Sequence, residues 1–355
     1  MRIGIDATAL IHKQPTGVER VTRELLEALL GQDRGNQYLL YTPEPLGSSW
    51  ARFANVENRV LPARRWWTWR SLAPAISKDN LDLFWSPSNT LPTNLPAKSL
   101  ATIHDLAFLH FPKSYSWATR LRSFLTVGRA VQTANKIITV SEQTKQDLIK
   151  KFSLSESKVE VIPNALPNMP VATPIPYILG DYILVVGRVE ARKNPTTAIK
   201  AFALIANQYP KLQLIFVGSD GYKAEEAKAL ASQLGLANRI QFVGFAEEKV
   251  LANLYAHARV ALFPSFYEGF GLPVLEAFHY GVPLVASNTP AVAEVAGDSA
   301  LLVEPTDTVA MSHALTQLLE DPELRAKLIE KGAERLKQYS WEASAEKLIE
   351  VIKSI

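Results

Sequence analysis

The sequence predicts an α/β protein made of two doubly wound domains, and three observations carry this prediction. The chain has 355 residues, and a chain of this length ordinarily forms about two domains. Short runs rich in β-branched residues alternate with longer stretches of helical periodicity, which is typical of a parallel sheet covered by helices on both faces. A proline-rich stretch interrupts the alternation near the middle of the chain, so we expect one sheet on each side of it.

The first half of the chain contains six short apolar runs that we expect to form one sheet. The runs are 2–7, 37–42, 81–85, 99–104, 136–140 and 159–162. Strands of this length separated by helical patterns are joined by crossover connections, which make their sheet parallel. We place them in an N-terminal domain of residues 1–165.

The linker and the second half follow the same logic. Prolines recur too closely for regular pairing between 163 and 176, and we take 166–180 as the linker. The alternation then resumes in a C-terminal domain of residues 181–338, whose expected strands are 182–186, 213–217, 240–243, 260–263, 283–286 and 300–303. Ser340 is a helix N-cap signal ahead of an amphipathic pattern, so 339–355 is predicted to be a last helix. Whether it packs back on the N-terminal domain is left open.

Composition narrows the functional classes. The chain has no cysteine, which excludes disulfides, thiolate metal sites and a cysteine nucleophile, and fits a reducing cytosol. We find no apolar run of membrane-spanning length and no export signal, so we expect a cytoplasmic protein. Residues 1–165 carry 21 basic and 14 acidic side chains, against 17 and 21 in the remainder. The first half is therefore basic, but no nucleic-acid motif accompanies this charge.

A glycine-rich loop between two glutamates is the most informative segment. It follows the strand expected at 260–263, and Pro273 suits the first position of a helix. Backbone N–H groups of such a loop, with the partial positive charge of a helix N-terminus, bind anions or sugar hydroxyls. Glu268 precedes the glycines, and we expect Glu276 in the first helical turn. Taken alone, the two glutamates are better explained by solvation and the helix dipole.

Context changes this interpretation. Glu268 and Glu276, with Gly269–Pro273 between them, resemble the E-x7-E signature of retaining glycosyltransferases of the GT4 type. Further segments resemble the same family in the same order: 16–26, 102–106, 140–148, 185–194 and 297–305. The resemblance spans nearly the whole chain. It implies the GT-B fold, in which two Rossmann-like domains face a cleft. The domain of residues 1–165 would bind the acceptor, and that of residues 181–338 would bind the nucleotide sugar.

The resemblance also implies catalytic roles. Arg188 and Lys193 would neutralise the diphosphate of a nucleotide sugar, and they flank the end of an expected strand ahead of Asn194, an N-cap signal. On composition alone these cations would be an ordinary basic surface loop. His104, at the carboxyl end of a strand, would bind a sugar hydroxyl, and Glu268 would touch sugar hydroxyls as well. Arg192 matches the family less clearly than Lys193.

The remaining implied residues bind the donor. Glu276 would hold the ribose, because a carboxylate only accepts hydrogen bonds and suits two hydroxyl donors. The others lie on loops that follow expected strands: Gly17, Gly244, Phe245, Gly269, Phe270, Gly271 and Leu272. Gly244 and Phe245 would read the base, largely through backbone groups. This leaves uracil and guanine hard to tell apart.

Metal ligands and cofactor motifs are missing from the sequence. There is no Asp-x-Asp triplet, and the six histidines form neither an HExxH nor an HxH pattern. No G-x-G-x-x-G turn follows the first strand, which disfavours a nicotinamide dehydrogenase. We expect no metal and no cofactor.

The sequence thus predicts a retaining, metal-independent hexosyltransferase acting on a glycan or lipid-linked acceptor. Residues 104–117 most resemble O-antigen and exopolysaccharide mannosyltransferases, which makes GDP-mannose the first donor and a UDP-sugar the second. The alternative is a catalytically silent sugar-nucleotide-binding partner subunit. The presence of His104, Arg188, Lys193, Glu268 and Glu276 together argues against it.

A basic aromatic cluster, Arg64–Arg70, leaves two interpretations open. Either one or two of its tryptophans pack into the N-terminal core at the start of a helix, the favoured interpretation, or the cluster lies in a lipid interface with the arginines on anionic headgroups. With the basic first half, the second interpretation would bring the enzyme to the inner face of the cell membrane.

Overall fold

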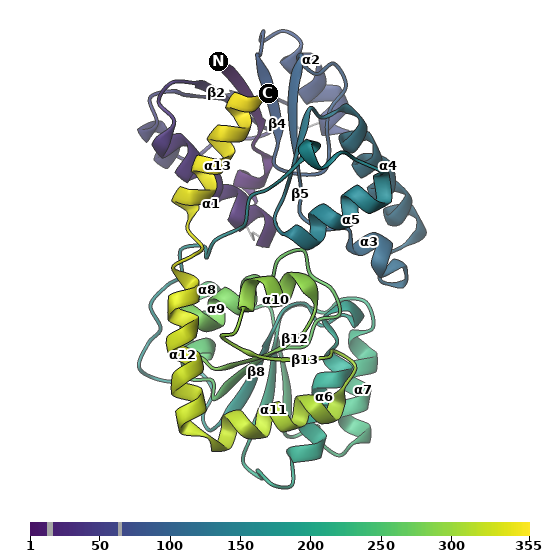
Figure 1. Cartoon of the computed structure of the whole chain (residues 1–355), viewed down its shortest axis with the longest axis vertical. Helices are drawn as coiled ribbons and strands as arrows, with labels where there is room; N and C mark the ends of the chain where they lie inside the picture. The colour runs from purple at the N-terminus through teal and green to yellow at the C-terminus, as the bar shows by residue number, and fades with distance from the viewer. Residues whose placement is uncertain (13–16, 63–65) are drawn as a thin grey trace. The chain divides into compact units, whose positions relative to one another are not determined.

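The computed structural model describes residues 1–12, 17–62 and 66–355 and divides into two compact units (Figure 1). Unit 1 contains Met1–Leu109, Trp117–Pro167 and Tyr339–Ile355, and unit 2 contains His110–Ser116 and Asn168–Gln338. The segment His110–Ser116 lies within the predicted N-terminal domain but groups with unit 2. Its aromatic rings explain this, because His110 stacks on Tyr267 and Phe111 stacks on Phe266 (ring centroids 4.5 and 6.1 Å apart).

Unit 1 is built on a parallel sheet of seven strands in the order β3-β2-β1-β4-β5-β6-β7. Their bounds are β1 Arg2–Asp6, β2 Gln37–Thr42, β3 Val56–Val60, β4 Leu83–Ser86, β5 Lys98–Ile103, β6 Lys136–Thr139 and β7 Val159–Val161. Six of them confirm predicted strands. The edge strand β3 was missed because three of its five residues are polar and none of the five is buried.

Helices cover the sheet of unit 1, and most of them belong to the crossover connections between its parallel strands. Their bounds are α1 Gly17–Gln32, α2 Ala73–Ile76, α3 Ala107–His110, α4 Trp117–Thr133, α5 Glu142–Phe152 and α13 Trp341–Ser354. Strand side chains such as Ile3, Ile5 and Trp85 are fully buried, as are Leu26 and Leu29 of α1. Burying each such large side chain contributes roughly 1.5–3 kcal/mol.

The last helix, α13, belongs to unit 1 and packs beside α1 (Figure 1). Ser340 caps it as predicted, its hydroxyl accepting from the Ala343 N–H at 3.1 Å. Its apolar face, with Leu348 and Ile352 fully buried, joins the unit 1 core. The Ser344 hydroxyl donates to the Pro163 carbonyl at 2.7 Å, which ties the helix to the end of the unit's last strand.

Unit 2 has a parallel sheet of six strands in the order β10-β9-β8-β11-β12-β13. The strands are β8 Tyr182–Val186, β9 Gln213–Val217, β10 Ile240–Gly244, β11 Val260–Phe263, β12 Leu284–Ser287 and β13 Leu301–Val303. The helices are α6 Pro195–Ile205, α7 Ala224–Gln233, α8 Glu248–Ala256, α9 Leu272–His279, α10 Pro290–Ala296, α11 Thr308–Glu320 and α12 Pro322–Leu336. All six strands were predicted to within one residue at either end.

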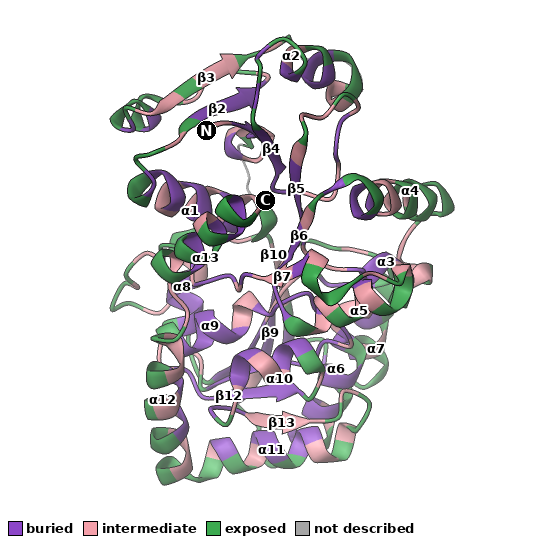
Figure 2. Ribbon diagram, turned by 45° about the horizontal axis from the view of Figure 1, so that its top comes forward, coloured by how far each residue is buried: buried purple, intermediate pink, exposed green. Residues whose placement is uncertain are grey.

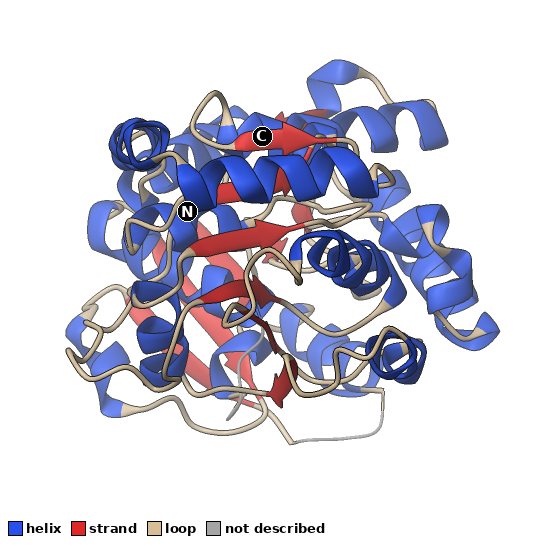
Figure 3. Cartoon of the chain, turned by 90° about the horizontal axis from the view of Figure 1, so that it is seen from below, coloured by secondary structure: helices blue, strands red, loops and turns tan. Residues whose placement is uncertain are grey.

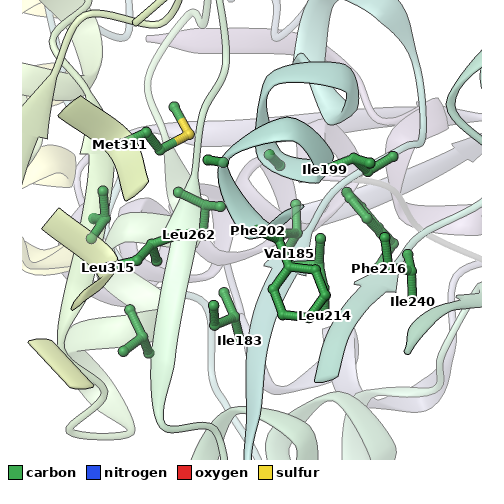
Figure 4. Packing of buried hydrophobic residues seen from close by; sticks show 14 of the residues in the cluster. Ile183, Val185, Ile199, Phe202, Leu214, Phe216, Ile240, Leu262, Met311 and Leu315 are labelled. Carbon is green, nitrogen blue, oxygen red and sulfur yellow. The ribbon is translucent and has the colours of Figure 1, made fainter. Parts of the chain in front are cut away.

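Helices lie on both sides of the strands (Figure 3), so both units are doubly wound. Part of the unit 2 core is drawn in Figure 4, where Phe202 and Ile199 of α6 and Met311 and Leu315 of α11 meet the strand side chains. The strand order reverses direction between β1 and β4 in unit 1 and between β8 and β11 in unit 2. Ligands of doubly wound sheets bind at the carboxyl ends of strands at such reversals.

Two findings concern membranes. Within the described ranges, no helix is both long enough and apolar enough to span a bilayer. In the basic aromatic cluster, Arg64 and Arg65 lie outside the described residues. Trp66 and Trp69 are exposed (55% and 39%) and Trp67 is half-buried, so of the three tryptophans Trp67 alone is partly covered by the unit.

Candidate active site

Two neighbouring strands of unit 2 carry the predicted cationic and acidic residues. Strand β8 pairs with β11, and the loops after them are 187–194 and 264–271. Because both strands end at the same edge of a parallel sheet, these loops meet. A backbone hydrogen bond from the Phe266 N–H to the Arg192 carbonyl (2.9 Å) joins them. The pairing of the strands therefore brings together residues about 75 positions apart in sequence.

Glu268 lies at the centre of a buried ion-pair cluster. Its Oε1 is 2.6 Å from Lys193 Nζ, and its Oε2 is 3.2 Å from Arg192 Nη1. Burial alone would raise the pKa of this carboxyl, but the Lys193 and Arg192 cations hold the pKa of Glu268 below its ordinary value. Glu268 is therefore a carboxylate near neutral pH, as its predicted contact with hydroxyl donors requires.

Arg192 has a larger part in this cluster than the sequence indicated. Its guanidinium pairs with Glu190 (2.9 Å) as well as Glu268, and it donates to the Tyr267 carbonyl at 2.9 Å. It thus holds the backbone beside Glu268 as well as the carboxylate itself. No local pattern could have revealed this, because its partners lie on another strand's loop.

Arg188 differs from the other two cations. Its side chain is exposed, and among the residues that the structure describes it forms no ion pair. It lines a small hollow at the end of β8 together with Gly187, Lys193, Pro195 and Ser265. Lys193 and Arg192 already face carboxylates, so Arg188 supplies uncompensated positive charge to this hollow.

Asn194 fixes the start of α6 at the same place. As predicted, it is the N-cap, with its side-chain oxygen accepting from the Thr197 N–H at 3.4 Å, and Pro195 is the first helical residue. Its amide nitrogen donates to the carbonyls of Pro264 (3.0 Å) and Pro305 (2.6 Å). The buried side chain therefore links the helix N-terminus to the loop after β11, which places a partial positive charge beside the cations.

The glycine loop leads directly into α9. Gly269, Phe270 and Gly271 are buried, and Gly271 is the N-cap with a φ of 114°, a backbone conformation that favours glycine. Leu272 is the first helical residue and Pro273 the second, so Pro273 lies one position later than expected. Glu276 consequently lies beyond the first turn, and that part of the prediction is wrong.

Glu276 is buried and has a specific partner. The Tyr255 hydroxyl, from α8, donates to its Oε2 at 2.8 Å, and the Tyr255 ring stacks on Tyr280 at 5.6 Å between centroids. A solvated helix-capping glutamate, the plainer alternative, does not describe this environment. Tyr255 was missed because an aromatic residue in an amphipathic helix is usually a core residue.

The end of β10 and the loop after it carry the last two predicted donor-binding residues of unit 2. Gly244 ends the strand with a φ of 79°, and its carbonyl accepts from the Gly218 N–H at 2.8 Å. Phe245 follows with 60% of its surface exposed. Gly218, also missed, must be glycine, because a Cβ there would lie 2.2 Å from the Gly187 carbonyl oxygen. This close approach packs the end of β9 against the loop of Arg188.

In unit 1, His104 follows β5 and lines a separate hollow with Thr22, Thr102 and Asn164. Its Nε2 donates to the Pro87 carbonyl at 2.9 Å, which leaves Nδ1 as an acceptor. Burial lowers the pKa of His104, so the ring is neutral near pH 7. The neighbouring Asp105 accepts from the Ala107 N–H at 2.9 Å, an orienting role for the loop.

The first glycine loop is only partly described. Gly17 is exposed and begins α1, whereas Thr16 of the same motif lies outside the described residues. In the described part of the chain, no three His, Cys, Asp or Glu side chains are grouped so that they could hold a metal ion.

Known protein families match both halves of the chain. The family model "Glycosyl transferases group 1" matches residues 180–335, and "Glycosyltransferase Family 4" matches residues 15–167. O-antigen chain mannosyltransferase B of Escherichia coli is 30% identical over 275 residues, covering 73% of this chain and 71% of that protein. A D-inositol 3-phosphate glycosyltransferase of Corynebacterium jeikeium is 30% identical over 239 residues, covering 61% of this chain and 57% of that protein.

Solved structures show the same fold across the chain. Sucrose-phosphate synthase from Thermosynechococcus elongatus superposes with a TM-score of 0.77 at 22% identity, covering 100% of this chain and 98% of that one. Anabaena Alr3699/HepE in complex with UDP and glucose gives a TM-score of 0.74 at 19% identity, covering both chains fully (100%).

Proposed function

The chain belongs to the group 1, family 4 glycosyltransferases with the GT-B fold, and on this basis we propose that it transfers mannose from GDP-mannose with retention of configuration. The acceptor is a hydroxyl of a glycan or of a lipid-linked glycan. The observation that carries the proposal is the cluster at the carboxyl ends of β8 and β11. There, Arg188 and Lys193 line one hollow beside a helix N-terminus, and Glu268 forms an ion pair with Lys193.

The cluster suits the chemistry of a leaving diphosphate. As the bond between the anomeric carbon and the phosphate oxygen breaks, negative charge grows on the diphosphate. Preorganised cations that meet this charge accelerate the step. Arg188 is exposed, and within the described ranges it has no ion-pair partner to give up when it pairs with the phosphates. Lys193 lines the same hollow, and the ion pair between its Nζ and Glu268 Oε1 (2.6 Å) fixes its position.

Bond formation follows on the same face of the sugar. The acceptor oxygen bonds to the anomeric carbon, and its proton passes to the departing diphosphate, so no covalent enzyme intermediate forms. We assign Glu268 and the neutral His104 to hydroxyls of the transferred sugar. A carboxylate accepts from these hydroxyls, and the free Nδ1 of His104 does the same.

Nucleotide recognition falls to the loops around α9 and β10. We assign Glu276 to the ribose hydroxyls, with Tyr255 fixing the rotamer of the carboxylate. We assign the backbone of Gly269, Phe270, Gly271 and Leu272 to the phosphates and sugar of the donor, and that of Gly17, at the start of α1, to the donor as well. Gly244 and Phe245 meet the base, and the exposed Phe245 ring is available to stack on it.

The choice of donor rests on the relatives. The Escherichia coli relative named as an O-antigen mannosyltransferase covers more of this chain than the inositol-phosphate relatives do, which supports mannose and hence GDP-mannose. A UDP-sugar is the second choice, because the Anabaena structure contains UDP. We place the reaction in the cytoplasm, at the inner face of the cell membrane.

A thermal-shift panel of nucleotide sugars tests the donor. A donor at 100 times its dissociation constant stabilises the fold by about 2.7 kcal/mol. We expect GDP-mannose to raise the melting temperature more than UDP-glucose, UDP-N-acetylglucosamine or ADP-glucose at equal concentration. A larger increase in melting temperature with a UDP-sugar than with GDP-mannose would show that the donor is a UDP-sugar.

Activity without a divalent metal is a further expected result. Arg188, Lys193 and the N-terminus of α6 supply the charge that a metal provides in other enzymes. Dialysis against EDTA is therefore expected to leave turnover of the donor unchanged. Turnover that is lost in EDTA and restored by magnesium or manganese would contradict this assignment.

A further inference from the structure

The first half of α4, in unit 1, exposes an unusual amount of apolar surface. All four large apolar side chains between residues 117 and 125 are exposed: Trp117 (75%), Leu121 (43%), Phe124 (41%) and Leu125 (60%). The second half of the helix is held in the unit by Val127, Ala130 and Val131, which are buried. Figure 2 shows the change from buried to exposed residues along α4. The fold therefore anchors one end of this helix and presents the other.

A groove runs along this exposed face. Trp117, Arg120, Leu121 and Phe124 recur at the spacing of one helix face and line it opposite Phe108 and Leu109, which lie on α3. Its volume is about 290 Å³, and its lining is almost wholly apolar. Contiguous apolar surface of this kind, left in water, costs about 25 cal/mol per Å². Such patches mark surfaces that are covered by a partner.

The charged side chains of α4 are all basic. Residues 106–141 contain five basic side chains and no Asp or Glu. Arg120 and Arg122 are exposed on α4 itself. The ring of Phe124 stacks on that of Phe152 at 6.0 Å, and this contact brings the end of α5, with the exposed Lys150 and Lys151, beside the groove. An apolar face rimmed by cations complements an anionic surface.

We propose that this α4 surface, defined by Trp117, Arg120, Leu121, Arg122, Phe124 and Leu125, docks the enzyme on an anionic lipid bilayer. The tryptophan and phenylalanine enter the interface, an acyl chain occupies the groove, and the arginines meet anionic headgroups. The inference rests on the proposed function, because the bilayer on which this surface docks is where a lipid-linked acceptor lies.

A second copy of the chain fits this surface less well. Self-association through α4 would set Arg120 and Arg122 of one copy against the same cations of the other, and like charges across an interface disfavour it. The exposed Trp66 and Trp69 form a different patch, on η3 (Thr68–Leu72) and the residues before it, and they serve as a control for aromatic residues in general.

Vesicle sedimentation of the full chain tests the proposal. The probes are phosphatidylcholine vesicles with and without 30 mol% phosphatidylglycerol, at constant ionic strength. We expect binding to the anionic vesicles only. Arg120→Gln with Arg122→Gln should weaken binding about fivefold for each charge removed. Leu121→Ser with Phe124→Ser should weaken it at least tenfold, whereas Trp66→Ser with Trp69→Ser, and Leu204→Ser on the exposed surface of unit 2, should not.

Several outcomes would overturn the docking surface. They are equal binding to both kinds of vesicle, no binding, or loss of binding in the Trp66/Trp69 variant but not in the α4 variants. A dimer that dissociates only in the α4 variants, without vesicle binding, would identify a second copy as the partner. Melting curves confirm that each variant is folded. Donor hydrolysis in free solution is measured separately, so failure of the proposed function would appear there and leave the vesicle result unaffected.

Discussion

Arg188→Ala is expected to lower the turnover number on the order of 100-fold or more, with little change in melting temperature. The side chain is exposed and forms no ion pair among the described residues, so its removal leaves no protein charge unpaired. Its contribution is confined to the charge that develops on the diphosphate. A 100-fold loss corresponds to about 2.7 kcal/mol of transition-state stabilisation. Steady-state kinetics on the donor measures it.

Lys193→Ala is the variant to compare with Arg188→Ala. It should lower turnover similarly, but it should also lower the melting temperature, because it leaves the buried Glu268 carboxylate with Arg192 alone. The pKa of Glu268 is lowered in the folded state, so the stability from this pair is present above the ordinary carboxyl value of 4.5. It is lost as pH falls through the lowered value. The melting difference between wild type and Lys193→Ala should therefore shrink below about pH 4.5.

Binding of the free nucleoside is the control for both variants. Guanosine carries no phosphate, so its affinity should be unchanged by either substitution. Near-normal turnover in both variants would show that the diphosphate is bound elsewhere.

Glu268→Ala and Glu276→Ala are expected to affect different kinetic constants. Glu268 is held by two cations at the end of β11, and its loss should depress turnover, because the sugar must be held while its anomeric carbon gains positive charge. Glu276 is held by Tyr255, and its loss should mainly raise the Michaelis constant, because ribose contacts are similar in the ground and transition states. A tenfold change in either constant corresponds to about 1.4 kcal/mol.

The glutamine variants separate charge from shape at the same two positions. Glu268→Gln removes the partner charge of Lys193 and Arg192, so its melting curve must be compared with wild type before its kinetics. Glu276→Gln keeps an acceptor for the Tyr255 hydroxyl and should have a smaller effect than Glu276→Ala. The same change in the same constant for both alanine variants, or no change in either, would contradict the separate roles.

The architecture was largely predictable from sequence because buried parallel strands are continuous apolar runs. Twelve of the strands were found in this way, and β3 was not, since its Glu57, Asn58 and Arg59 face a partly solvated edge. The N-caps Asn194 and Ser340 were predicted for a similar reason. A cap is a local hydrogen bond, and its residues are adjacent in the chain.

The contacts within the site were not predictable in the same way. Arg192 and Glu268 are 76 positions apart, and only the pairing of β8 with β11 brings them together. Tyr255 and Glu276 meet from two different helices. The exposed face of α4 was not predicted from the sequence, for another reason. Its apolar residues follow helical spacing, and that spacing alone does not tell whether a face is covered.

Release of nucleoside diphosphate from GDP-mannose by the purified chain tests the central claim most directly. We predict release without added metal, at a rate reduced on the order of 100-fold by Arg188→Ala. Release should be faster when an acceptor is present. A chain that binds GDP-mannose in the thermal-shift assay yet releases no nucleotide, with or without acceptor, would contradict transfer of mannose from this donor.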